Sequence, residues 1–338
     1  MPLLAAEPFG DYAFAFKVLM AIVGAAALVG CGAVLSSLGR PALAPLLLVA
    51  VSPLALGSVF LNRYDIWPAF LTVVSLALLL RRRLAGAMAV SALGTATKIF
   101  PAAALPPAVA WARRRGGAGQ GRRAVLIWVG VVLAALLPFA AIGPGGLRFT
   151  FTIQATRHLE TESLGGSLLL VADRLGLYDA NIHTGSPGSL DVFGALPSAI
   201  GVLAMLAVIV AIVWITVQTV RRAPTGEQIV TATAAAITAY VAFGKVLSPQ
   251  YLVWLVPLVP LVRSRLASVL LLAALVLTQI EFDHEYSGLH TVGGVVWVLL
   301  ARNVVLAGLA VVLLLGCSAR RLPDVDAVHE EVPVAGAT

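Results

Sequence analysis

Residues 62–101 read NRYDIWPAFLTVVSLALLLRRRLAGAMAVSALGTATKIFP, and this stretch decides the fold. Its two long apolar runs lie between three polar clusters, at residues 62–65, 81–83 and 97–101. The first apolar run carries no charge at all. Uncharged runs of this kind, bounded by arginines, predict helices that cross or enter a lipid bilayer.

Asp65 and Lys98 stand at the ends of these apolar runs. An ionisable group costs roughly 2.5–3.5 kcal/mol at the centre of a bilayer span and less near its end, so such residues usually mark a site. Two structural alternatives stay open. Asp65 would then pair locally with Arg63, and Lys98 would extend its amine to the headgroup region.

The composition of the whole chain agrees with a membrane protein. Of its 338 residues 60% are hydrophobic and 12% are charged, and the mean hydropathy is +0.97. Soluble domains carry about 25% charged residues, so we expect an all-α, polytopic helix bundle. The net charge of +7 does not indicate nucleic-acid binding, because the basic residues must first be assigned to the two sides of the membrane. Cys31 and Cys317 predict neither a disulfide nor a metal site, and a requirement for a divalent metal stays open.

Hydropathy predicts about eleven spans, within a range of about ten to twelve. The fourth and fifth are short helices that meet at Lys98, each roughly 20 Å long against a hydrocarbon layer of roughly 30 Å. Broken helices of this kind form binding sites in membrane proteins. The predicted spans are residues 18–36, 42–61, 66–80, 84–97, 99–112, 124–142, 198–220, 228–247, 250–262, 266–281 and 292–316.

The polar segments between the spans complete the predicted organisation. Residues 143–197 form one long extracytoplasmic loop, in which residues 168–177 are too short to span and lie in the interface as an amphipathic helix. Residues 178–196 are expected to be irregular, residues 113–123 to be a loop, and residues 283–285 to be a solvated turn. Residues 1–320 thus form one transmembrane domain, followed by a disordered cytoplasmic tail at 321–338.

The positions of the arginines test this predicted order of spans and loops. Fifteen of the 20 arginines fall on one side, which the positive-inside rule makes cytoplasmic. The amino terminus is then outside the cytoplasm and the carboxyl terminus inside. The same threading gathers the polar clusters on the extracytoplasmic face, which indicates one site there. The fifteen are Arg40, Arg81, Arg82, Arg83, Arg113, Arg114, Arg115, Arg122, Arg123, Arg221, Arg222, Arg263, Arg265, Arg320 and Arg321.

Three short motifs, in this order, resemble those of a known enzyme group. They are Asn62-Arg63-Tyr64-Asp65 followed by Lys98-Ile99-Phe100-Pro101, then Arg157 with Glu162-Ser163, then Gly244-Lys245 with Ser248-Pro249-Gln250-Tyr251 and Trp254. The pattern is similar to the GT-C superfamily of glycosyltransferases that use polyprenyl-phosphate sugars. It is most similar to glycosyltransferase family 87, the DUF2029 α-mannosyltransferases, over roughly residues 10–320.

The resemblance implies a transferase of the cell membrane. It would move a hexose, mannose by the family's habit, from a polyprenyl-phosphate donor to a hydroxyl of an extracytoplasmic glycan or glycolipid, with inversion. No cofactor beyond the lipid-linked donor is implied. The family's members begin with a span and a large outer loop that carries the catalytic acid. We expect this chain to lack that region, which leaves the activity of the short form in question.

The chemistry assigns roles to particular residues. Cations placed where the phosphate leaving group develops charge assist its departure, and a carboxylate must deprotonate the acceptor hydroxyl. Asp65 and Glu162 are candidate bases, with Asp11 as a substitute for the missing acid. The cations are Arg63, Lys98, Arg157 and Lys245, and further substrate contacts are Asn62, Tyr64, Ser163, Gln250 and Tyr251.

Several alternatives stay open. Arg157 and Glu162 are equally well read as ordinary loop charges, and Lys245 and Gln250 as caps of a helix junction. Arg302 lies within a span and needs a partner, which is either structural or the donor phosphate. At the level of function, a transporter or flippase and a non-catalytic subunit compete with the enzyme. The absence of an internal repeat and the clustering at one face favour the enzyme over the transporter.

Overall fold

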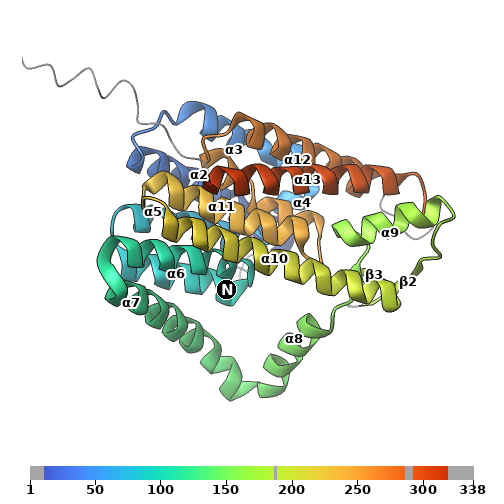
Figure 1. Cartoon of the computed structure of the whole chain (residues 1–338), viewed down its shortest axis with the longest axis horizontal. Coiled ribbons are helices and arrows are strands. Elements are labelled where there is room, and N and C mark those ends of the chain that lie inside the picture. The colour runs from blue at the N-terminus through green and yellow to red at the C-terminus, as the bar shows by residue number, and fades with distance from the viewer. Residues whose placement is uncertain (1–10, 186–188, 286–291, 319–338) are drawn as a thin grey trace, which may run out of the picture.

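A computed structural model describes residues 11–185, 189–285 and 292–318. Most of these residues form a bundle of helices that run broadly along one direction, whereas the second half of α7 (Leu105–Ile142) and α8 (Pro144–Thr156) project from it (Figure 1). Among the described residues, five helical segments are long and apolar enough to cross a membrane. They are α2 (Tyr12–Ser37), η1 with α7 (Phe100–Ile142), α10 (Ala195–Arg221), α12 (Arg265–Glu285) and α13 (Val295–Ser318). The predicted helical membrane bundle is confirmed at this level, and the count of eleven spans stays a prediction.

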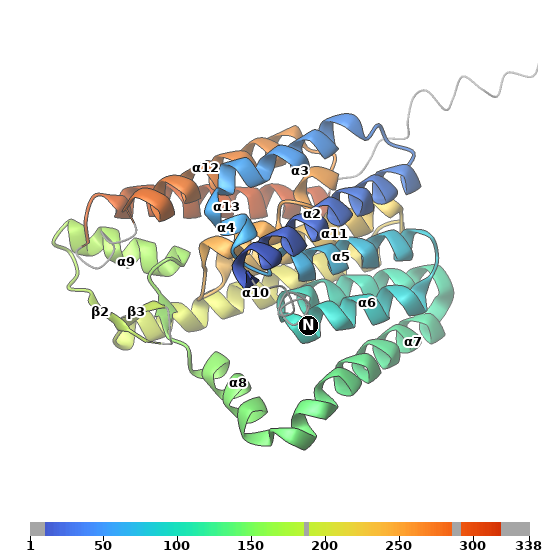
Figure 2. The same cartoon turned by 180° about the vertical axis from the view of Figure 1, so that it is seen from behind.

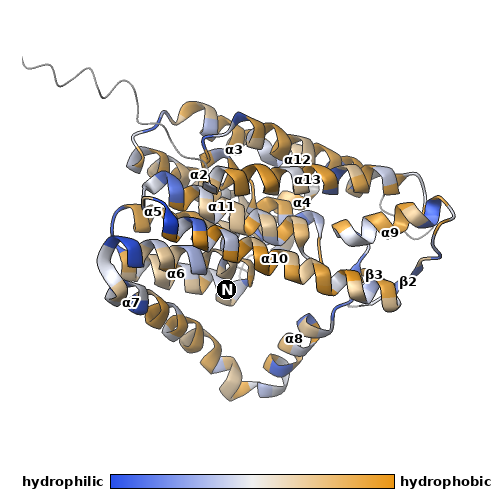
Figure 3. Ribbon diagram, in the orientation of Figure 1, coloured by the Kyte–Doolittle hydropathy of each residue, from blue (hydrophilic) through white to orange (hydrophobic). Residues whose placement is uncertain are grey.

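Shorter helices complete the bundle. They are α3 (Leu43–Leu56), α4 (Ser58–Leu61), α5 (Ile66–Leu80), α6 (Leu84–Thr97) and α11 (Gly226–Phe243). Helix α11 is the central one and is buried along most of its length (Figure 2). Its buried face is rich in alanine and threonine, which lets neighbouring helices approach closely. Apolar side chains such as Leu137 and Val202 are instead exposed, as expected of lipid-facing helices. Most of the α10 ribbon is accordingly coloured as hydrophobic in Figure 3.

The predicted break at Lys98 is confirmed. Helix α6 ends at Thr97, and Lys98 has an extended backbone, with φ −158° and ψ 135°. The chain then forms the 3-10 helix η1 (Phe100–Ala104) before α7 (Leu105–Ile142) begins. The break places the Lys98 side chain at the end of the bundle that carries the other candidate site residues.

The segment predicted as a span at residues 250–262 is not an α-helix. This segment forms two 3-10 helices, η2 (Pro249–Trp254) and η3 (Val259–Leu261), because its prolines remove backbone donors and block a continuous α-helix. Irregular backbone is tolerated at membrane depth only where protein buries it. The segment is indeed buried, and the Cys31 thiol donates to the Pro257 carbonyl across 3.3 Å.

Two other predicted boundaries need correction. Residues 113–123 are helical and belong to α7, apart from a break at Gly116 and Gly117, where φ of Gly117 is +80°. A two-glycine turn is therefore enough to reverse the chain. In the predicted span 42–61, α3 ends at Leu56, before Gly57 at φ +54°.

The long loop is more ordered than predicted. It holds α8 (Pro144–Thr156), β1 (Leu159–Glu160), α9 (Leu164–Arg174), β2 (Asn181–Thr184) and β3 (Leu190–Phe193). The three strands form an antiparallel sheet in the order β1-β3-β2, so the prediction of irregular structure at 178–196 is wrong. The register places Glu160 opposite Asp191.

Three further polar segments were predicted. The predicted amphipathic helix exists as α9 and packs against α13. Residues 283–285 lie in the last turn of α12, so they do not form the predicted turn. The predicted tail at 321–338 lies outside the described residues.

The arginine-rich loops meet at one end of the bundle. Arg40 donates to the Leu261 carbonyl across 2.5 Å, and Arg222 donates to the carbonyl of Ser318 at the end of α13. Helix α9 and the three strands lie at the opposite end (Figure 1). The arginine-rich loops and the long polar loop, which the charge pattern assigns to opposite sides of the membrane, thus lie at opposite ends of the bundle.

Candidate functional site

Asp65 and Lys98 form an ion pair at the end of the bundle opposite the arginine-rich loops. Lys98 Nζ lies 2.6 Å from Asp65 Oδ1, and the Trp254 indole donates to the same oxygen across 2.6 Å. Asp65 directly precedes α5, yet its side chain makes no bond to that helix, as an N-cap residue usually would. The local pair with Arg63 is therefore ruled out as the explanation of Asp65. Its other oxygen, Oδ2, has no hydrogen-bond partner among the described residues.

Three aromatic rings surround the Lys98 amine. Its Nζ lies 5.3 Å from the ring centroids of Tyr64 and Tyr251 and 5.2 Å from that of Trp254. These distances fit cation–π attraction. Phe100 and Tyr251 stack on Trp254 at centroid distances of 4.0 and 4.1 Å. Lys98 thus turns inward to Asp65 instead of extending to the headgroups, and its side chain remains 17% exposed.

A second cationic group joins the long loop to the chain after α11. Lys245 Nζ donates to the Arg157 carbonyl across 2.6 Å, and the Glu160 amide donates to the Lys245 carbonyl across 3.0 Å. The Arg157 guanidinium in turn lies 3.3 Å from Glu160 Oε1. Pro249 favours an extended residue before it, and Ser248 is extended, so the chain passes from α11 to η2 without helix. Arg157 and Lys245 are thereby held side by side.

Glu160 is almost fully buried, and burial raises the pKa of its carboxyl from near 4.5 to about 7. The Arg157 guanidinium opposes this rise, while Asp191 on the adjacent strand adds to it. Glu160 Oε2 has no hydrogen-bond partner among the described residues. The sequence did not single out Glu160 or Asp191, because nothing in the loop's composition signals the sheet that brings them together.

The raised pKa of Glu160 makes stability depend on pH. Between about pH 4.5 and 7 the folded protein keeps a proton that the unfolded chain has lost, so stability falls as pH rises through this window. The expected contribution is on the order of 3 kcal/mol. Glu160→Gln should flatten the fall in the thermal midpoint of the detergent-solubilised protein between pH 5 and pH 8. Glu227→Gln, at the opposite end of the bundle, is the control; parallel curves for wild type and Glu160→Gln would contradict the assignment.

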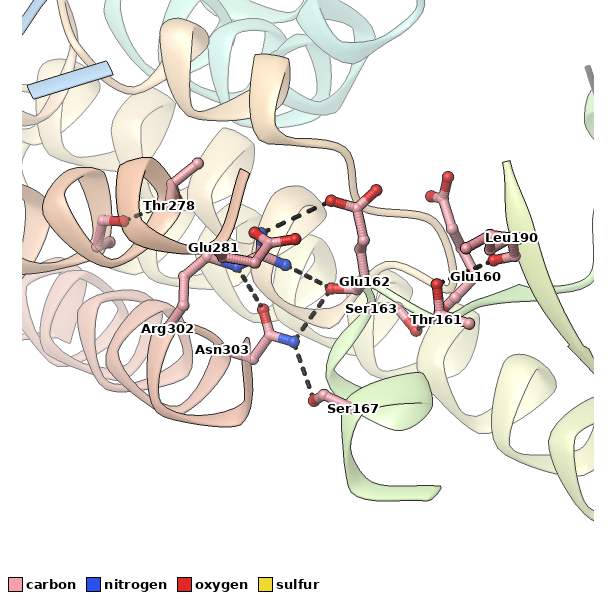
Figure 4. Close-up of polar contacts among 11 residues, drawn as sticks. Glu160, Thr161, Glu162, Ser163, Ser167, Leu190, Thr278, Glu281, Arg302 and Asn303 are labelled. Carbon is pink, nitrogen blue, oxygen red and sulfur yellow. Dashed lines mark hydrogen bonds and ion pairs between the residues drawn. The ribbon is translucent and has the colours of Figure 1, made fainter. Parts of the chain in front are cut away.

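Arg302 is the centre of a buried network (Figure 4). It is fully buried and lies 2.5 Å from Glu281 and 3.9 Å from the Glu162 carboxylate. It also donates to the Glu162 backbone carbonyl across 2.7 Å, and Asn303 donates to the same carbonyl across 3.0 Å. Arg302 therefore has its partner within the protein. Burial, with Glu281 adding to it, raises the pKa of the Glu162 carboxyl.

Two hollows adjoin the site. The first is a groove of about 310 Å³ with Arg157 and Lys245 at its polar part. The second has a volume of about 130 Å³ and includes Asn62, Arg63 and Gln250. The rest of the lining comes from His158 and Leu159 and from a mainly apolar face of α10, made of Pro197, Ser198, Gly201, Val202, Met205 and Leu206.

The structure brings some of the predicted site residues together and gives others a separate role. The structure brings Asp65, Lys98 and their aromatic neighbours together, and both Arg63 and Arg157 are close enough to act electrostatically on Lys98. Ser163 is a cap: its hydroxyl accepts from the Gly166 amide of α9 and donates to the Glu160 carbonyl. Glu162 belongs to the Arg302 network. Asp11 caps α2, and no hydrogen bond or ion pair among the described residues joins it to the cluster.

No family model matches this chain, and no curated protein matches it either. The function is therefore inferred from the geometry and chemistry of the site.

Proposed function

We propose that the protein is a membrane glycosyltransferase that takes a hexose, mannose in our proposal, from a polyprenyl-phosphate donor. The acceptor is a hydroxyl of a glycan or glycolipid, and the transfer inverts the anomeric centre. The groove beside α10 is the observation that carries this proposal. Its apolar wall and its two adjacent cations, Arg157 and Lys245, match a ligand with an apolar tail and an anionic head.

The charges of the groove suit a phosphate. Partial burial lowers the pKa of the Lys245 amine, and the neighbouring Arg157 guanidinium lowers it further. A bound phosphate would offset both effects. The same two cations would then stabilise the negative charge that grows on the phosphate as the sugar leaves. The outer surface of α10 continues the groove with exposed apolar residues, including Val202, Leu206 and Val210, along which a polyprenyl chain can lie in the bilayer.

Asp65 is the base that we assign. Its Oδ2 atom is unpartnered among the described residues, while Lys98 and Trp254 hold Oδ1 and so fix the orientation of the carboxylate. A positioned carboxylate of this kind can take a proton from a hydroxyl. Glu162 is a weaker candidate, since Arg302 and Glu281 enclose it.

Transfer is tested by the release of polyprenyl phosphate from polyprenyl-phosphate mannose in membranes that contain the protein. Arg157→Ala and Lys245→Ala should each lower kcat/KM for the donor by about 10- to 100-fold, because each removes a cation from the developing phosphate charge. Arg148→Ala, which removes an exposed arginine of α8, should have no effect. Release that is absent from the wild type, or equal in all four proteins, would contradict the proposal.

We also propose that the site faces away from the cytoplasm and that the carboxyl terminus lies inside a plasma membrane. The gathering of the arginine-rich loops at the other end supports this orientation. In intact cells, a cysteine at Thr184 should react with an impermeant thiol reagent, whereas one at Gly119 should not. Both positions are exposed, and the native Cys31 and Cys317 are buried, so the wild type serves as the unlabelled control. The reverse pattern would overturn the orientation.

A further inference from the structure

Four hydrogen-bonding side chains line the second hollow, and two of them, Asn62 and Arg63, are exposed. Asn62 and Arg63 follow α4, and Ser248 and Gln250 lie where η2 begins. Within the described residues, none of these four side chains makes a hydrogen bond or an ion pair with another residue. Apolar groups complete the wall, among them Pro249. A small hollow with several free donors and acceptors and an apolar wall suits a polyhydroxylated ligand.

The hollow adjoins the centre of the site. Tyr64 directly follows Arg63, Tyr251 directly follows Gln250, and both tyrosine rings pack around the Lys98 amine. Arg63 acts electrostatically on Lys98 from this side, and Arg157 does so from the side of the groove. Each hollow thus contributes one arginine that acts electrostatically on Lys98.

One segment of the chain contributes to both hollows. Lys245 lines the groove, and Ser248 and Gln250 line the second hollow only a few residues later. The groove borders the lipid-facing surface of α10, whereas the second hollow is smaller and its free side chains are polar. The two hollows thus suit ligands of different chemistry.

We infer that the second hollow binds the acceptor and that this acceptor presents a saccharide or polyol group to it. The identification of this ligand as the acceptor rests on the proposed transfer reaction. Binding of a saccharide or polyol in the hollow does not require transfer. Asn62 and Gln250 supply amide donors and acceptors to the hydroxyls, Ser248 supplies a hydroxyl, and Arg63 supplies guanidinium donors.

The experiment measures binding without turnover. Saturation-transfer NMR on the detergent-solubilised protein, with methyl α-mannoside, methyl α-glucoside and myo-inositol as probes, should show binding of at least one probe. The double variant Asn62→Ala/Gln250→Ala should weaken it about tenfold, since two hydrogen-bonding side chains are lost. Gln154→Ala, which removes an exposed amide of α8, should bind as the wild type does. The thermal midpoints of all three proteins report whether they are folded.

The outcomes separate this inference from the proposed function. No binding of any probe, or equal binding by the double variant, overturns the inference while leaving donor cleavage as a separate question. Displacement of the probe by inorganic phosphate, lost in Arg63→Ala, would make the hollow an anion site and also overturn the inference. Binding that needs Asn62 and Gln250, in a protein that releases no polyprenyl phosphate, would keep the polyol site and reject the transferase.

Discussion

Lys98→Met should abolish transfer and lower the free energy of unfolding by about 3 kcal/mol. The variant leaves the Asp65 carboxylate buried without its cation, and breaking a buried ion pair in this way costs about 3–5 kcal/mol. We expect the lower end of that range because the Lys98 side chain is 17% exposed. Transfer should fall by at least about 100-fold, since the amine that holds Asp65 in place is gone. The measurements are the thermal midpoint in detergent and the release of polyprenyl phosphate.

A second variant separates folding from function. In Asp65→Asn/Lys98→Met no charge remains to be buried, so most of the stability should return, while transfer should stay absent because the base is gone. Lys17→Met is the matched control, as Lys17 is exposed on α2. If the double variant transferred sugar within about twofold of the wild type, neither Asp65 nor Lys98 would have the role that we assign.

The Asp65–Lys98 pair also shows how far the sequence alone could lead. The two residues were predictable as site residues because each is a charge at the end of an apolar run, where the bilayer makes charge costly. Their contact was not predictable, because it depends on the packing of α5 against α6 and on Trp254 from a distant segment. Trp254 itself belongs to the motif after α11, but nothing in that motif predicts that its indole donates to Asp65.

The long loop was the least predictable region. Its composition is typical of irregular structure, yet β1 and β3 pair within it and bring Glu160 beside Asp191. Short strands held by a neighbouring bundle need no strong pattern of their own, because tertiary contacts decide their structure. The residues 250–262 show the converse effect. Their hydropathy is that of a span, but prolines and burial inside the bundle favour 3-10 turns.

Replacement of Arg302 is the second change for which we expect a large loss of stability. Arg302→Met should lower the free energy of unfolding by about 3–5 kcal/mol, since it strands the Glu281 carboxylate in a fully buried site. It also leaves the Glu162 carbonyl with only its bond from Asn303. Arg148→Met, on the exposed face of α8, is the control and should change the thermal midpoint little.

The double variant Arg302→Met/Glu281→Met decides between a structural and a donor-binding role for Arg302. Replacing both members of a buried pair by apolar side chains is often close to neutral for stability, so the thermal midpoint should recover most of the loss. If Arg302 is structural, as its complete burial indicates, KM for the donor should also stay within about twofold of the wild type. A stable double variant with a donor KM raised tenfold or more would instead mean that the arginine leaves Glu281 to meet the phosphate. The network that joins α13 to the long loop would then open during the reaction.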